Sequence, residues 1–151
     1  PFWTQQLRAL GWHGESLQVA INTIRLGLQR TLEDAEGLWL LDPSHADSQC
    51  ELALHHWGEN GARELVIDRT FVVDGVRWII DYKSSTPMAG QSLEQFLAQE
   101  VDEYRGQLKR YCAAFQALGE NRIVAALYFP LLDSKPRLHQ VLGDPAIPGG
   151  Y

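Results

Sequence analysis

The sequence is poor in cysteine, with two, Cys50 and Cys112, among 151 residues. Two cysteines at this length do not form the disulfide framework of a small secreted domain, so a reducing, cytoplasmic setting is expected. Long apolar runs are also missing: none approaches the roughly 20 residues that span a bilayer, and no segment has the pattern of a signal peptide. We therefore expect no membrane partner. The chain begins at Pro1 without a methionine, and we expect it to be a piece of a larger protein.

Basic residues do not outnumber acidic ones either. The chain has 13 Lys and Arg against 19 Asp and Glu, a formal net charge of −6. This balance argues against a free-standing, nonspecific nucleic-acid binder, which is usually basic. It does not exclude an acidic metal site whose DNA is delivered by neighbouring domains. The length and the 45% hydrophobic content predict one globular domain over residues 1–151.

The most informative stretch runs from Glu64 to Lys83. Asp74-Gly75 lies between two runs of β-branched and aromatic residues, which predicts a hairpin with a type I′ turn. The numbers of cross-strand partners then add to 149, so Asp68 and Asp81 oppose each other on one face, with Cβ atoms about 5 Å apart. Lys83 lies two residues beyond Asp81 and shares that face.

Two opposed carboxylates need a reason to be there. Like charges directly across a sheet are destabilising, and burial raises the pKa of one of them unless a cation lies between them. A hard divalent cation such as Mg²⁺ removes this conflict. The alternative is an exposed face, on which Asp68 pairs with Arg69 or Lys83 as solvated ions. A register slip of one residue would send the aspartates to opposite faces.

The remaining segments predict an α/β fold, a mixed central sheet flanked by helices. Before the hairpin we expect a short helix in 1–14, a helix over 15–34 that packs its apolar stripe on the core, a short strand over 36–43, a strand over 50–57 and a turn at 58–61. Together with the hairpin, these last two would form an antiparallel meander over residues 50–83.

After the hairpin, Ser92 to Gln95 has the sequence of a capping box and predicts a helix that runs to about Leu118. The apolar run 122–129 predicts a strand covered on both faces and parallel to the Asp81 strand. The tail, 131–151, is expected to be irregular.

The candidate site joins Asp68, Asp81 and Lys83 with Gln107 and Tyr111. Gln107 and Tyr111 are four residues apart, so they lie on one face of the predicted helix. Carboxylate-bound cations neutralise a phosphodiester and lower the pKa of a bound water, and a nearby ammonium orients that water. For Gln107 and Tyr111 an ordinary amphipathic helix remains the alternative.

Three segments resemble a known family. Val66-Ile67-Asp68-Arg69, Ile79-Ile80-Asp81-Tyr82-Lys83 and the helix segment from Tyr104 to Tyr111 resemble the nuclease domain of the RecB/AddA branch of the PD-(D/E)XK nucleases. That branch shows an Ile-Asp-Arg strand, an Asp-Tyr-Lys strand and a Tyr-x-x-Gln-Leu-x-x-Tyr helix in the same order. The resemblance covers residues 50 to about 130.

The resemblance implies a restriction-endonuclease-like α-β-β-β-α-β core, with a helical part in 1–49, the nuclease core in 50–130 and a tail in 131–151. It implies an exonuclease V-like, Mg²⁺- or Mn²⁺-dependent deoxyribonuclease at the C-terminus of an ATP-dependent, UvrD/RecB-like superfamily 1 helicase. Such a protein acts in DNA double-strand-break repair and recombination. The implied partners are DNA, helicase domains of the same polypeptide and a second subunit.

The resemblance also implies roles for individual residues. Asp68 and Asp81 would be catalytic metal ligands, the backbone carbonyl of Tyr82 a third ligand, and Lys83 the catalytic lysine. Gln107 and Tyr111 would contact DNA. Glu51 matches a glutamate often found before the hairpin and is a candidate metal ligand, with a surface or structural role as the alternative.

The sequence departs from the family in two places. Val66 stands where the family usually has glycine, and the metal-binding histidine of an early helix is missing, because 15–34 contains no histidine and His13 lies between glycines. Either that histidine lies upstream of Pro1 or the site lacks it. In the first case this chain alone would bind metal poorly and cleave weakly. In the second, the alternative is a catalytically degenerate module that guides DNA or binds a partner subunit.

Overall fold

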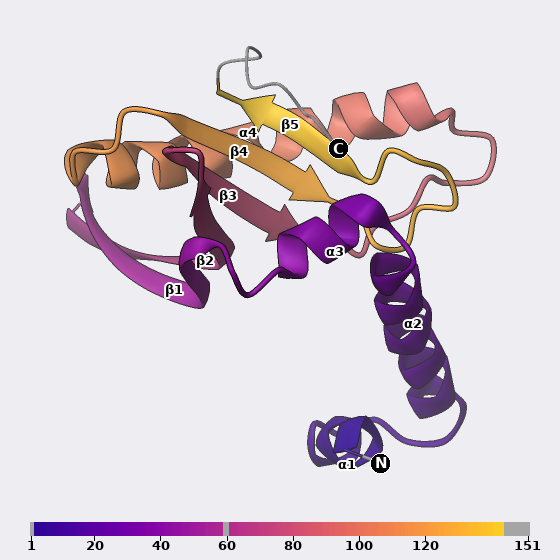
Figure 1. Ribbon diagram of the computed structural model, residues 1–151. Coiled ribbons are helices and arrows are strands. Elements are labelled where there is room, and N and C mark those ends of the chain that lie inside the picture. Colours follow the sequence, from indigo (N-terminus) through magenta and orange to yellow (C-terminus); the bar gives the residue numbers. More distant parts are fainter. Residues whose placement is uncertain (1, 59–60, 144–151) are drawn as a thin grey trace.

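The computed structural model describes residues 2–58 and 61–143, which form an α/β fold with a five-stranded mixed sheet flanked by helices (Figure 1). The elements are α1 (Phe2–Ala9), α2 (Gly14–Leu32), α3 (Ala35–Leu41), β1 (Ala46–Gly58), β2 (Gly61–Val73), β3 (Val76–Tyr82), α4 (Leu93–Ala117), β4 (Ile123–Tyr128) and β5 (Leu138–Leu142). The run from α3 to β4 has the α-β-β-β-α-β order that the family resemblance implies, with helix α3 in place of the strand expected over 36–43.

The sheet has the predicted meander and the predicted parallel pair. Its strand order is β1-β2-β3-β4-β5, with β3 and β4 parallel and the other neighbours antiparallel. Partners across the β2–β3 hairpin have numbers that add to 149, such as Arg69 with Ile80. Asp74 and Gly75 both have positive φ, 51° and 71°, as a type I′ turn requires. The predicted hairpin register is confirmed from the turn out to Arg69 and Ile80, and the expected pair of Asp68 and Asp81 lies one step beyond the last paired residues.

Each face of the sheet is covered by a different helix. On one face α4 packs its Leu108 and Phe115 against Ile67, Ile79 and Leu127. On the other, α3 places Leu40 against a second cluster, composed of Phe71, Val76, Trp78, Ile80, Val124, Ala126 and Tyr128. Alternate residues of β4 thus enter both clusters, and this explains why its sequence is apolar throughout.

Residues 36–43 do not form the predicted strand, because most of them belong to helix α3. A short apolar run such as Leu38 to Leu41 has no period that separates a strand from a buried helix. Only glycine fits at position 37, because a Cβ there would lie 2.2 Å from the Thr31 carbonyl oxygen and 2.7 Å from the Tyr128 hydroxyl. The missing side chain lets the first turn of α3 lie directly against α2 and β4.

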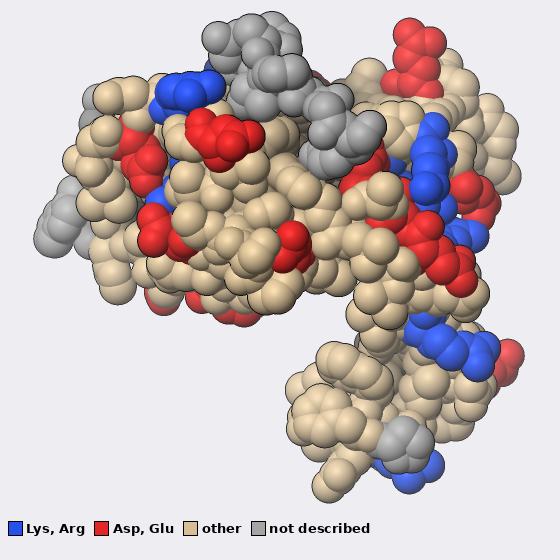
Figure 2. Space-filling model, viewed as in Figure 1, with Lys and Arg blue, Asp and Glu red and all other residues tan. Residues whose placement is uncertain are grey.

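The apolar stripe of α2 packs on the core less than predicted. Leu17 is buried, but Leu28 and Leu32 are 47% and 57% exposed. Together with Trp3 of α1 they line an open groove between the two helices. Figure 1 shows α1 and most of α2 projecting from the body, and the surface around α1 is mostly uncharged in Figure 2. The prediction of core packing is therefore wrong for Leu28 and Leu32.

The prediction of an irregular tail over 131–151 is wrong for Leu138–Leu142, which pairs with β4 as strand β5. The rest of the tail from 144 to 151 lies outside the described residues, and so do residues 59 and 60 of the predicted turn.

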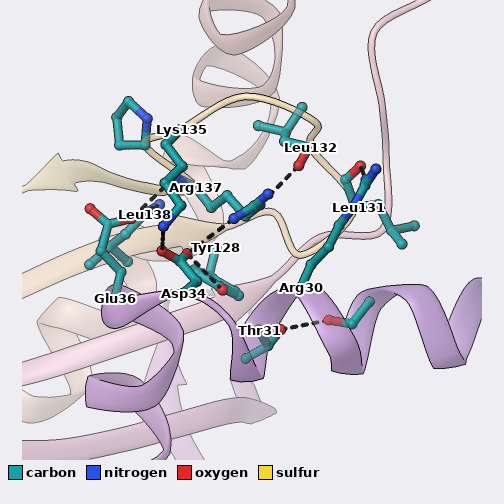
Figure 3. A network of polar contacts seen from close by, with 12 residues as sticks. Arg30, Thr31, Asp34, Glu36, Tyr128, Leu131, Leu132, Lys135, Arg137 and Leu138 are labelled. Atoms are coloured by element: carbon teal, nitrogen blue, oxygen red, sulfur yellow. Dashed lines mark hydrogen bonds and ion pairs between the residues drawn. The ribbon is translucent and has the colours of Figure 1, made fainter.

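The connection before β5 is bound to the α2–α3 corner by polar contacts (Figure 3). Asp34 is 1% exposed and pairs with Lys135 Nζ at 2.8 Å. The Glu36 carboxylate accepts hydrogen bonds from the backbone N–H groups of Arg137 and Leu138. These contacts fix the loop that follows β4.

Candidate active site

The side chains of β2 stop alternating regularly between the two faces of the sheet at Asp68. Leu65 and Ile67 face α4, whereas two residues on, Arg69 faces α3 and donates from Nε to the Leu40 carbonyl oxygen. Strand β1 is irregular at the same level: the pairs on either side place Glu51 across from Asp68, and Glu51 has a positive φ of 51°, which is uncommon for a residue with a side chain. The break lets Ile67 stay in the core while the Asp68 carboxylate accepts a hydrogen bond from the Tyr82 N–H at 2.8 Å.

Asp81 is the buried member of the acidic pair. It is 3% exposed, its Oδ1 accepts a hydrogen bond from Gln107 Nε2 at 3.0 Å, and its Oδ2 lies 2.5 Å from Lys83 Nζ. Burial raises the pKa of Asp81, Lys83 opposes this, and the negative charge of Asp68 raises the pKa further. The two carboxylates thus interact, and the alternative of a fully solvated face does not hold for Asp81.

Lys83 is held from three sides. Its backbone N–H donates to the Tyr128 carbonyl oxygen at 2.9 Å, which continues the β3–β4 pairing. Its ammonium pairs with Asp81 and also lies 3.5 Å from the centre of the Tyr104 ring. Its side chain is 16% exposed, so most of it is shielded from solvent.

Gln107 and Tyr111 connect the two strands through α4. Gln107 Nε2 donates to the Tyr111 hydroxyl oxygen at 2.5 Å as well as to Asp81. The Tyr111 hydroxyl donates to the Val66 carbonyl oxygen on β2 at 2.7 Å, and Tyr111 is 4% exposed. The helix thereby fixes the distance between the strands that carry Asp68 and Asp81. The DNA contact that the family resemblance implies for these two residues stays a prediction.

Sequence reasoning missed one buried acidic residue near the site. Glu100 is 7% exposed and accepts a hydrogen bond from Ser85 Oγ at 2.7 Å. The signal was present in the spacing, because Glu100, Tyr104, Gln107 and Tyr111 follow one another at steps of four, three and four, which is one face of a helix. The predicted capping box fixes the start of that helix: Ser92 and Gln95 make both of its hydrogen bonds.

The other predicted site residues are less closely joined. Glu51 is exposed, and within the described ranges no hydrogen bond or ion pair links it to either aspartate. The Tyr82 peptide lies beside the acidic pair through its N–H, while its carbonyl remains a predicted ligand. His13 is the residue before α2, far in sequence from the strands.

The carboxylate oxygens of Asp68 and Asp81 are of the kind that Mg²⁺ and Mn²⁺ bind. Among the described residues, no three His, Cys, Asp or Glu side chains gather at one metal position, as a structural zinc site would require. Mg²⁺ is usually held by one or two carboxylates plus water and substrate phosphate. Asp81 Oδ2 is buried and makes no hydrogen bond with the described residues beyond its contact with Lys83. Asp68 and Asp81 together therefore offer the kind of oxygen ligands that Mg²⁺ prefers.

Comparisons with known proteins give no support for or against a metal site at Asp68 and Asp81. Within 2–58 and 61–143, no helix has the length and apolar character needed to cross a membrane. No protein-family model matches the chain, and no curated protein matches it.

Proposed function

We propose that this chain is a Mg²⁺- or Mn²⁺-dependent nuclease domain that hydrolyses phosphodiester bonds in DNA. The observation that carries the proposal is the buried Asp81 carboxylate, with Lys83 on one oxygen and Gln107 on the other and the charge of Asp68 close enough to raise its pKa. The order of the three RecB/AddA-like segments supports the same reading.

Each residue has a part in this chemistry. Asp68 and Asp81 would hold the ion, which would neutralise the phosphodiester and lower the pKa of a bound water. The ammonium of Lys83 can donate a hydrogen bond to the attacking water and offset negative charge that develops on the phosphate. Gln107 holds Oδ1 of Asp81, so the carboxylate keeps one orientation. Tyr111 holds β2 at Val66, two residues before Asp68.

The larger protein that we propose is an ATP-dependent helicase-nuclease of double-strand-break repair and recombination. The three segments that resemble the RecB/AddA branch support this, and the net charge of −6 is compatible with it because an acidic domain holds DNA poorly by itself. Helicase domains of the same polypeptide, or a second subunit, would deliver the DNA.

The test is the substitution Lys83→Met. Cleavage of linear DNA in Mn²⁺ should be lost, because the methionine fills the same space without a charge, while the thermal unfolding transition stays cooperative. Lys109→Met is the matched control, since Lys109 is exposed on α4, and it should cut like the unsubstituted chain. Undiminished metal-dependent cutting by Lys83→Met would contradict the proposal.

The second candidate is a degenerate module that guides DNA or binds a partner subunit. The observation in its favour is the missing histidine, since 15–34 has none. A longer chain that includes upstream sequence separates the two. Restored cleavage supports the nuclease, whereas equal and negligible cleavage by both chains supports the degenerate module.

A further inference from the structure

Tyr104 presents the face of its ring to the side chain that the proposed chemistry needs most. Lys83 Nζ lies 3.5 Å from the ring centre, well inside the range of a cation–π contact. The same ammonium lies 2.5 Å from Asp81 Oδ2. Lys83 therefore has two partners of different kinds, one charged and one neutral.

The two partners respond differently to a divalent cation. An ion bound by the Asp81 carboxylate repels the ammonium, because both are positive and close together in a partly buried site. The ring carries no net charge, and its negative face still attracts the ammonium. We propose that Tyr104 is a positioning residue that keeps the Lys83 ammonium in the site when a divalent ion is bound by the Asp81 carboxylate. This inference rests on the proposed nuclease function.

The surroundings hold the ring and the lysine in a fixed relation. Ser85, two residues after Lys83, donates to the buried Glu100 carboxylate at 2.7 Å. Glu100 lies one helical turn before Tyr104 on α4, so the two residues share a face. The chain just after Lys83 is thus bound to α4 near Tyr104 by a hydrogen bond that does not involve Asp81.

Nuclear magnetic resonance tests the contact without any enzyme assay. The chain has three lysines, Lys83, Lys109 and Lys135, so three ε-methylene signals are expected, and Lys83→Met identifies the first. The Lys83 signal should lie upfield of the other two, because it is above an aromatic ring. It should stay there in Tyr104→Phe, move to the position of the others in Tyr104→Leu, and remain upfield in the unsubstituted chain at saturating Mg²⁺. A signal that joins the other two when Mg²⁺ binds would overturn the proposal.

Kinetics with the active, longer chain give the second test. A cation–π contact in a partly desolvated site corresponds to about a 5- to 30-fold effect. Tyr104→Leu should therefore lower kcat by about 5- to 30-fold with KM unchanged, and Tyr104→Phe should restore kcat. A leucine variant with unchanged kcat, or a phenylalanine variant as slow as leucine, would overturn the proposal.

The two possible failures are distinguishable. If calorimetry shows that the unsubstituted chain binds no Mg²⁺ and the longer chain does not cut DNA, the proposed function fails, and the role of Tyr104 in it fails too. If Mg²⁺ binds and DNA is cut but the Lys83 signal is not upfield, the nuclease proposal stands and the positioning role of Tyr104 is wrong.

Discussion

Tyr111→Phe removes one atom, the hydroxyl oxygen, and tests whether that atom has a structural role or contacts DNA. The Tyr111 hydroxyl donates to the Val66 carbonyl oxygen at 2.7 Å and accepts from Gln107 at 2.5 Å. Phenylalanine fills the same space, so no cavity forms, but the Val66 carbonyl loses its donor and Gln107 Nε2 loses one of its two acceptors. An unsatisfied buried group costs about 1–3 kcal/mol. The hydrogen bond to Val66 is only partly buried, so water can partly replace the hydroxyl and the lower end applies. A loss of about 1 kcal/mol lowers Tm by about 2–4 °C in a domain of this size.

The functional part of the prediction has two measurements. Mg²⁺ affinity, measured by calorimetry, should fall, because β2 carries Asp68 and is no longer held at Val66. DNA affinity, measured by anisotropy in EDTA, should not change, since Tyr111 is 4% exposed. Tyr82→Phe is the control: among the described residues the buried Tyr82 hydroxyl has no hydrogen-bond partner, so its removal should leave Tm unchanged or raise it. Unchanged Tm with markedly weaker DNA binding in Tyr111→Phe would refute the reasoning.

Three further predictions concern stability. Burial would raise the pKa of Asp34, but Lys135, Tyr128 and Arg137 together bring the pKa below its usual value. The stability that the ionised carboxylate adds is complete above the unfolded pKa of about 4 and is lost as the pH falls through the folded pKa. Asp34→Asn should therefore lower the free energy of unfolding at pH 7. It should also flatten the decline of that free energy in acid, as measured by urea titration at several pH values. Gly75→Ala should cost about 1 kcal/mol, because φ is 71°, seen as a lower urea midpoint at unchanged slope. Ser92→Ala removes the capping box and should cost about 1 kcal/mol by the same assay.

The parts of the fold that the sequence predicts are those with local chemistry. Asp74-Gly75 determines its turn by itself, and the turn sets the register out to Arg69 and Ile80, the residues next to Asp68 and Asp81. Ser92 and Gln95 likewise determine where α4 begins. From that start, helical spacing alone places Gln107 and Tyr111 on one face. No tertiary information is needed for any of these steps.

The predictions that fail depend on contacts between distant segments. Most of residues 36–43 join helix α3, where Gly37 fits against Thr31 and Tyr128, and Tyr128 is too distant in sequence for this contact to leave a local pattern. The strand Leu138–Leu142 forms because β4 offers it an edge. The same limit applies at the site: the hydrogen bond between Ser85 and Glu100 joins two residues that no local motif connects.

The contacts of α4 bear differently on the two candidate functions. Gln107 and Tyr111 bind the strands together, so a module that had lost catalysis would still need them, and their presence does not favour cleavage. Asp81 is different, because burial raises its pKa and its ionised form therefore reduces stability at neutral pH. Asparagine at position 81 would keep an acceptor for Gln107 and remove the buried charge. It would also leave Lys83 without its ion-pair partner, so a domain that only guides DNA would have to lose both charges, whereas a domain that binds a divalent ion and orients a water needs both. The ionisable oxygen beside Lys83 is thus the feature that favours the nuclease over the degenerate module.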